Sequence, residues 1–172
     1  MGLMGSGKST VGLVLARRLG RTYLDNDTEL QRRTGHSARE LATEEGPEAL
    51  HEDERAAFVD ALSRVEPALL GAPASVITDR GIREQLRGHF AVWLDTDIDT
   101  LASRFEHEAH RPAFGVDPLT LLRRQREERA PLYREAASLV VRPDPAAGPD
   151  DIVDEIVAAL RRAETDDEQR RQ

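Results

Sequence analysis

The sequence predicts an α/β fold in which a mostly parallel sheet is flanked by helices. Short apolar runs that suit strands alternate with amphipathic stretches of helical periodicity along most of the chain. A glycine-rich loop at residues 2–9 leads directly into the first amphipathic stretch, an arrangement that recurs in α/β proteins. These two observations favour alternating strand and helix units over an all-helical or all-β domain.

The helices are predicted from apolar periodicity and from the residues that start or stop helices. The first begins near Lys8 and ends before Gly20, with apolar residues at helical spacing between them. Gly35 and the Gly46-Pro47 pair separate the next three helices. The later helices are expected at residues 28–34, 38–45, 48–62, 98–105, 119–129 and around an amphipathic stretch at 152–160.

The strands are short, and the position of one is open. Strands are expected at 22–24, 90–94 and 139–141, whereas 68–70 and 75–78 compete for the remaining one. The loop at residues 2–9 has no room for a full strand before it, although a strand buried on both faces is expected to hold such a loop in place. We therefore expect an apolar strand-like run N-terminal to Met1 in the natural chain, without which the chain would be unstable.

Length and composition limit the classes of protein to consider. The 172 residues suit one domain, expected over 1–163, followed by a charged tail at 164–172 that we expect to be disordered. A net charge of -8 argues against nucleic-acid binding through bulk positive charge. The absence of cysteine excludes disulfides and thiolate metal sites. With no signal peptide or membrane-length apolar run, we expect a cytoplasmic, monomeric enzyme without membrane or nucleic-acid partners.

Residues 2–9 match the phosphate-binding pattern G-x-x-x-x-G-K-[ST]. Glycines allow backbone N–H groups to converge on phosphate oxygens, and the positive end of the following helix dipole faces the same point. In this pattern the lysine contacts the β- and γ-phosphates and the hydroxyl after it binds Mg²⁺. The residues expected to bind ATP are Gly2, Gly5, Ser6, Gly7, Lys8, Ser9 and Thr10.

Two carboxylates follow the predicted strand at 22–24. Asp25 and Asp27 lie two residues apart, so on an extended segment they share a side. Ligands of parallel sheets bind beyond the carboxyl ends of the strands. One carboxylate could therefore hold Mg²⁺ while the other orients a substrate hydroxyl or takes its proton. A polar turn with a helix cap is the alternative interpretation.

Several runs together resemble the shikimate kinase family. They are residues 2–12, Leu24-Asp25-Asn26-Asp27, Thr34-Gly35-His36-Ser37, Arg111-Pro112 and Arg129-Ala130-Pro131-Leu132-Tyr133. The resemblance implies a P-loop NTPase of the nucleoside monophosphate kinase-like fold. It also implies transfer of the ATP γ-phosphoryl group to the 3-hydroxyl of shikimate, with Mg²⁺ as cofactor.

The resemblance also implies roles for individual residues. On the nucleotide side it assigns Ser9 and Asp25 to the metal, whereas Arg104 and Pro149 correspond to residues that flank the adenine ring. The roles close to the transferred group are implied for Lys8 on the phosphates, Asp27 on the acceptor hydroxyl, Arg111 in a lid over the phosphoryl group and Arg129 on the acceptor carboxylate.

The acceptor side departs from the family pattern at two places. His51 is expected to bind the substrate where the family has a second carboxylate-binding arginine. Histidine cannot form a bidentate fork, but it could serve another acceptor as a neutral hydrogen-bond partner. A glycine triplet of the family is replaced by Gly71-Ala72-Pro73 or by Asp79-Arg80-Gly81, depending on which strand forms. The acceptor could therefore be shikimate, a related hydroxylated acid or a gluconate-type sugar acid. A nucleotide-binding protein without turnover is the third possibility.

Overall fold

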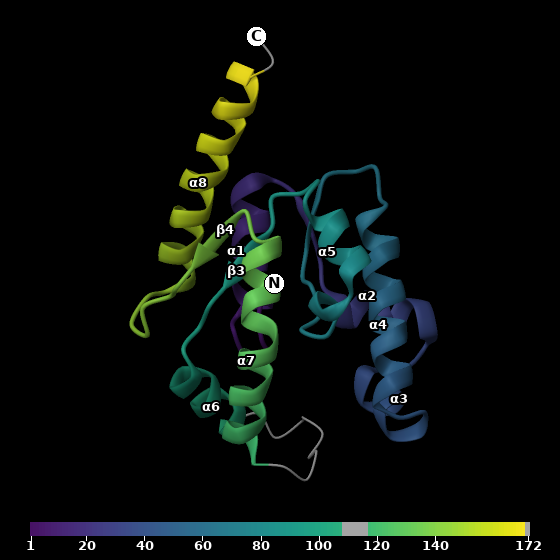
Figure 1. The fold of residues 1–172 in the computed structure, drawn as a ribbon. Coiled ribbons are helices and arrows are strands. Elements are labelled where there is room, and N and C mark those ends of the chain that lie inside the picture. Colours follow the sequence, from purple (N-terminus) through teal and green to yellow (C-terminus); the bar gives the residue numbers. More distant parts are fainter. Residues whose placement is uncertain (108–116, 171–172) are drawn as a thin grey trace.

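The computed structural model describes residues 1–107 and 117–170, and helices and strands alternate along them (Figure 1). This pattern confirms the predicted α/β class. The elements are α1 (Lys8–Leu19), β1 (Thr22–Leu24), α2 (Asn26–Thr34), α3 (Ala38–Glu44), α4 (Pro47–Leu62), β2 (Ala68–Leu70), a 3-10 turn (Val76–Thr78), α5 (Arg80–Leu86), β3 (Val92–Leu94), α6 (Ile98–His107), α7 (Pro118–Ala136), β4 (Leu139–Val141) and α8 (Pro149–Arg170).

The strands form two parallel pairs. In the first pair Leu24 of β1 lies opposite Leu70 of β2, and in the second Trp93 of β3 lies opposite Val140 of β4. Of the two candidate segments for the remaining strand, residues 68–70 form it, because they pair with β1. Residues 76–78 instead form a 3-10 turn, because the Arg83 guanidinium donates to the carbonyls at its end.

Of the helix boundaries that differ from the sequence prediction, two have a physical reason in the contacts of the structure. Helix α2 begins at Asn26 instead of residue 28, because the Asp25 side chain accepts the backbone N–H of Asp27 and so caps the helix. Helix α7 continues through Pro131, where we expected it to have ended. Two residues later Tyr133 is buried and stacks on Trp93 with ring centroids 5.5 Å apart, and this packing stabilises the continued helix.

The prediction that residues 164–172 are disordered is wrong for 164–170, the part of this segment that the structure describes. Helix α8 runs to Arg170, so 164–170 are helical although they are exposed. This part of the chain is rich in good helix formers, and the Thr165 hydroxyl donates to the Arg161 carbonyl one turn back.

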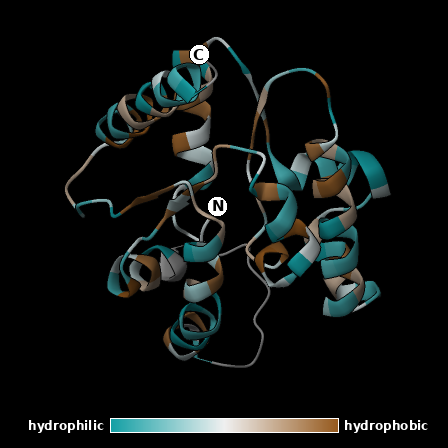
Figure 2. Ribbon diagram, turned by 45° about the horizontal axis from the view of Figure 1, so that its top comes forward, coloured by the Kyte–Doolittle hydropathy of each residue, from teal (hydrophilic) through white to brown (hydrophobic). Residues whose placement is uncertain are grey.

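The two faces of β3 contribute to separate parts of the core, since successive strand side chains point to opposite faces. Trp93 packs in a cluster with Leu122 and Tyr133 of α7. Leu94 packs on the other face with residues of α1 and α8, such as Val11 and Val153. In Figure 2 the helices carry both hydrophilic and hydrophobic residues, as expected when only one side faces the core. Helices therefore cover both faces of strand β3.

Gly12 is required where α1 packs on β1. A Cβ at Gly12 would lie 2.3 Å from Cε2 of Tyr23, and a Cβ at Gly71 would lie 2.3 Å from the Tyr23 hydroxyl. The Tyr23 ring therefore occupies space that only glycines leave at these two positions. This places the hydroxyl 3.3 Å from Asp25.

Gly12→Ala is expected to destabilise the fold by about 1–3 kcal/mol, because the rigid tyrosine ring must move to admit the methyl group. Urea unfolding measures the loss. Gly88→Ala is the matched control, since a Cβ there would approach no atom closer than 3.4 Å. In a Tyr23→Leu background the cost of Gly12→Ala should fall. Equal costs in both backgrounds would contradict the clash.

Candidate active site

The glycine-rich loop is held by hydrogen bonds from two distant segments. Gly7, with φ of 88°, is the N-cap residue of α1, so the first N–H groups of the helix have no side-chain cap. The Thr96 hydroxyl donates to the Ser6 carbonyl over 3.2 Å, and the Arg104 guanidinium donates to the Gly5 carbonyl over 2.9 Å. These two hydrogen bonds hold the loop at the N-terminus of α1. The first backbone N–H groups of that helix point toward the loop. The N-terminus of a helix in this setting is an anion site.

Lys8 places its ammonium against the same loop. Its Nζ donates to the carbonyls of Gly2 and Leu3 over 3.0 and 2.9 Å. Gly2 itself is enclosed, because a Cβ there would lie 2.8 Å from the Leu94 carbonyl oxygen. A fixed positive charge therefore adds to the helix dipole at one point, which is what a polyphosphate requires.

Ser9 and Asp25 form a pair of oxygen ligands beside the loop. The Ser9 hydroxyl donates to Asp25 Oδ2 over 2.8 Å, and the Tyr23 hydroxyl donates to the same oxygen over 3.3 Å. Burial raises the pKa of Tyr23 to about 12, so its hydroxyl stays a donor at neutral pH. The described residues contain no cluster of three or more side chains able to hold a metal alone. One hydroxyl and one carboxylate fit Mg²⁺ that takes its remaining ligands from phosphates and water.

A hollow of about 290 Å³ lies between three segments, which are α4, α7 and the turn that precedes α5. It brings together residues from three separate parts of the sequence and is rich in charge. Its lining residues are His51, Glu52, Arg55, Ser75, Val76, Thr78, Asp79 and Arg129. Two guanidinium groups, those of Arg55 and Arg129, line the hollow beside the carboxylates of Glu52 and Asp79, so it offers charge-assisted donors to a small anionic group.

Arg129 is anchored on one side and has unused hydrogen-bonding capacity on another. Its Nη1 donates to the Ala74 carbonyl over 3.0 Å, and the Tyr133 hydroxyl donates to the same oxygen over 3.2 Å. Its Nε is buried and has no hydrogen-bond partner. Arg129 also lines the hollow, so its guanidinium lies beside the space that a small anion would occupy.

Glu54 connects this hollow to the acidic pair. Burial raises the pKa of its carboxyl, while the hydroxyl of Ser75 donates to it and opposes the rise. The charges of Asp27, His51 and Arg129 act on this carboxyl more weakly than burial and the Ser75 hydrogen bond do. Asp27 does not line the hollow, so its role on the acceptor hydroxyl stays a prediction.

A sequence model described as shikimate kinase matches residues 4–161 of this chain. The chain belongs to the shikimate kinase family. The shikimate kinase of Ruegeria pomeroyi is 38% identical over 169 residues, covering 93% of this chain and 82% of the relative. That of Paracidovorax citrulli is 37% identical over 147 residues, covering 84% and 80%.

A solved structure shows the same family likeness. The shikimate kinase from Acinetobacter baumannii, in complex with shikimate, has a TM-score of 0.86 and 30% identity, covering 94% of this chain and 90% of that one. The P-loop NTPase fold of the nucleoside monophosphate kinase type, predicted from the resemblance, is thus confirmed. In the part of the chain that the structure describes, no helix has the length and apolarity needed to cross a membrane.

The remaining predicted nucleotide residues are only partly placed. Arg104 contacts the loop, whereas Thr10 is exposed on the first turn of α1 and Pro149 is exposed at the start of α8. Arg111 lies outside the described residues. Its lid role in this shikimate kinase family member stays a prediction.

The position of β2 decides how the chain departs from the shikimate kinase pattern. Since the strand is 68–70, Gly71-Ala72-Pro73 stands in place of the glycine triplet, and both Ala72 and Pro73 are buried. His51 lines the hollow, but it is exposed. The hollow wall is therefore built differently from the family pattern at two places.

Sequence reasoning missed several polar residues of the site. Arg55 follows His51 by one helical turn on α4, so both reach the hollow, and this i, i+4 spacing was a readable signal. Asp95 was also missed. It is buried after β3 and lies 2.7 Å from Arg126 and 3.1 Å from Arg142, so it ties α7 and β4 to the segment that holds the loop.

Proposed function

We propose that this protein transfers the γ-phosphoryl group of ATP to a hydroxyl of shikimate, with Mg²⁺ as cofactor, in the cytoplasm. The observation that carries the proposal is the hollow of about 290 Å³ that Arg129 lines, together with the influence that the charges of Asp27 and Arg129 both exert on Glu54. Family membership and the likeness to a shikimate kinase solved with shikimate support it. A hydroxylated carboxylic acid matches this pairing of a carboxylate with an arginine.

The residues divide the chemistry between them. Lys8 and the N–H groups at the start of α1 neutralise charge on the transferring phosphoryl oxygens. Asp27 accepts a hydrogen bond from the attacking hydroxyl and takes its proton as the new P–O bond forms. Arg129 binds the acceptor carboxylate. Ser9 and Asp25 would hold Mg²⁺, which would supply positive charge to offset that of the phosphate groups.

Arg55 takes the place of the missing second arginine. It lines the same hollow as Arg129, and its nearest acidic partner, Asp79, is 3.8 Å away, so this pair is weak. Because α4 presents residues four apart on one side, a guanidinium at 55 can reach a carboxylate that position 51 would otherwise bind. The acceptor carboxylate is thus held between α4 and α7.

Production of ADP with a panel of hydroxy acids tests the activity. Shikimate is expected to stimulate turnover strongly, and the 3-phosphate should appear by mass spectrometry. Turnover of gluconate in place of shikimate would mean that the acceptor has changed. ATP binding without turnover of any acid would identify a protein that only binds nucleotide.

Arg55→Gln is expected to raise KM for shikimate roughly ten- to hundredfold, because one charge-assisted hydrogen bond is lost. KM for ATP should stay unchanged. The exposed Arg80→Gln is the matched control, since that guanidinium pairs with Glu84 on its own helix and does not line the hollow. An analogue of shikimate with an alcohol in place of the carboxylate should respond little to Arg55→Gln. An unchanged KM for shikimate would refute the role of Arg55 without affecting the proposed activity.

A further inference from the structure

The Ser6 carbonyl of the phosphate loop is held by Thr96, a residue far from the loop in sequence. The Thr96 hydroxyl donates to this carbonyl over 3.2 Å, and both residues are buried, so water does not compete for the bond. The Ser6 carbonyl and the N–H of Gly7 belong to one planar peptide group and point in opposite directions. A bond that fixes the carbonyl therefore also fixes the direction in which the Gly7 N–H points.

The segment that carries Thr96 is in turn held by Arg126 of α7. Its Nη1 donates to the Thr96 carbonyl over 3.0 Å, and its Nη2 lies 2.7 Å from Oδ1 of the buried Asp95. Arg142 holds the other oxygen of this carboxylate over 3.1 Å. The void beside these groups measures only about 10 Å³, so Thr96 has little room to shift. One planar guanidinium thus binds a carboxylate and a carbonyl at once.

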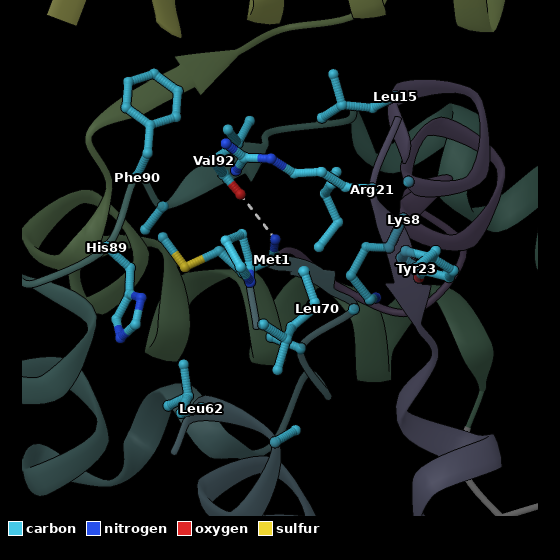
Figure 3. Close-up of a pocket in the computed structure, with 18 of the residues that line it drawn as sticks. Met1, Lys8, Leu15, Arg21, Tyr23, Leu62, Leu70, His89, Phe90 and Val92 are labelled. Carbon is cyan, nitrogen blue, oxygen red and sulfur yellow. Dashed lines mark hydrogen bonds between the residues drawn. The ribbon is translucent and has the colours of Figure 1, made fainter. Parts of the chain in front are cut away.

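Strand β3 also fixes the segment that leads into the loop. The Met1 amino group donates to the Val92 carbonyl over 2.7 Å, and the Met1 carbonyl accepts the Leu94 N–H over 3.0 Å. Figure 3 shows the first of these bonds as a dashed line, beside an apolar groove of about 450 Å³ between the two strand pairs. Aliphatic side chains that line this groove include Val11, Leu15, Leu70, Leu94 and Ile156. The start of the loop is thus held by β3 itself, and its later part by Thr96.

We propose that Thr96 and Arg126 are positioning residues of the phosphate loop. Arg126 fixes the segment after β3, and Thr96 turns the Ser6-Gly7 peptide so that its N–H faces the phosphates. Arg129 follows Arg126 by three residues on the same side of α7 and lines the acceptor hollow. One helix therefore supports both the loop and the acceptor arginine. The part of this role that concerns turnover rests on the proposed kinase activity, whereas nucleotide binding tests the loop alone.

Thr96→Val removes the hydroxyl and keeps the shape of the side chain, whereas Thr96→Ser keeps the hydroxyl. Thr165→Val is the matched control, because that exposed hydroxyl also donates to a carbonyl, but on α8. Isothermal titration measures binding of MgADP. Ligand-observed NMR measures binding of adenosine, which has no phosphate for the loop to hold. Steady-state kinetics with ATP and shikimate give kcat and both KM values.

Thr96→Val is expected to weaken MgADP binding roughly two- to tenfold, the effect of one neutral hydrogen bond, with adenosine binding unchanged. The kcat should fall by a similar factor or more, while KM for shikimate stays the same. Thr96→Ser and Thr165→Val should behave like the wild type. The role of Thr96 is overturned if Thr96→Val binds MgADP as tightly as the wild type. It is also overturned if MgADP and adenosine lose affinity equally, since that would indicate a general structural effect.

Arg126→Gln should reproduce the changes of Thr96→Val, and the double variant should be little worse than either alone, because both residues act on one peptide group. Arg124→Gln is the matched control, since that guanidinium is exposed on the same helix and pairs with Glu128. Full additivity would refute the role of Arg126. If Arg126→Gln does not fold, Thr96→Val alone decides. Altered MgADP binding without turnover of any acid would count against the kinase activity and leave the loop role standing.

Discussion

Replacing Lys8 by alanine is expected to lower kcat by about a thousandfold or more while the fold stays intact. The ammonium lies against the carbonyls of Gly2 and Leu3, at the N-terminus of α1, where charge on the transferring phosphoryl group must be neutralised. Removing a single preorganised donor of this kind costs about 10²–10³ in kcat, and here a full charge is lost as well. Steady-state kinetics with ATP and shikimate measure the effect, and circular dichroism checks the fold.

Arg17→Ala is the control for Lys8, since Arg17 is an exposed cation on the same helix. It should leave kcat unchanged. A Lys8→Ala enzyme within tenfold of wild-type turnover would show that the loop does not act in catalysis.

Lys8 is also the only lysine in the sequence, which allows a direct chemical measurement. ATP with Mg²⁺ should protect it from an amine-directed reagent. The amino group of Met1 is a separate site, and peptide mass spectrometry distinguishes the two.

Asp27→Asn is expected to lower kcat by about 10²–10⁴, the usual contribution of a general base. The amide keeps the size of the side chain and can accept a hydrogen bond, but it cannot take the proton of the acceptor hydroxyl. The backbone N–H of Asp27 still donates to Asp25, so the start of α2 should be preserved. KM for ATP should therefore change little.

Asp99→Asn is the matched control for Asp27, because Asp99 is an exposed aspartate in the first turn of α6. If Asp27→Asn and Asp99→Asn both retain kcat within threefold of wild type, Asp27 does not act as the base. A large loss in Asp27→Asn alone supports the proton-transfer role.

Local patterns were enough to predict the nucleotide half of the site. The phosphate loop is continuous in sequence, and its glycines, Lys8 and the start of α1 follow from the backbone conformation that such a loop requires. Asp25 lies only one strand away, so its position beside Ser9 depends on few long-range contacts. For the same reason β1 and β4 were predicted at their observed residues.

The acceptor half depends on contacts between distant segments, and the sequence predicted it less well. Arg55 and Arg129 meet only because α4 and α7 lie on either side of the turn at 75–79. The residue types at positions 55 and 129 do not by themselves reveal that the two side chains lie together. Likewise, the choice of 68–70 as a strand was made by its backbone pairing with β1, since two apolar runs suited a strand equally well.

By itself, then, the sequence determined the α/β class, the phosphate loop and the family, because these follow from local periodicity and contiguous motifs. The tertiary structure decided that α7 passes through Pro131, since burial of Tyr133 against Trp93 outweighs the helix bond that proline removes. It also decided which residues surround the acceptor, and that two parallel strand pairs face each other across an apolar groove. Those features arise from packing between segments far apart in the chain, which local propensity does not encode.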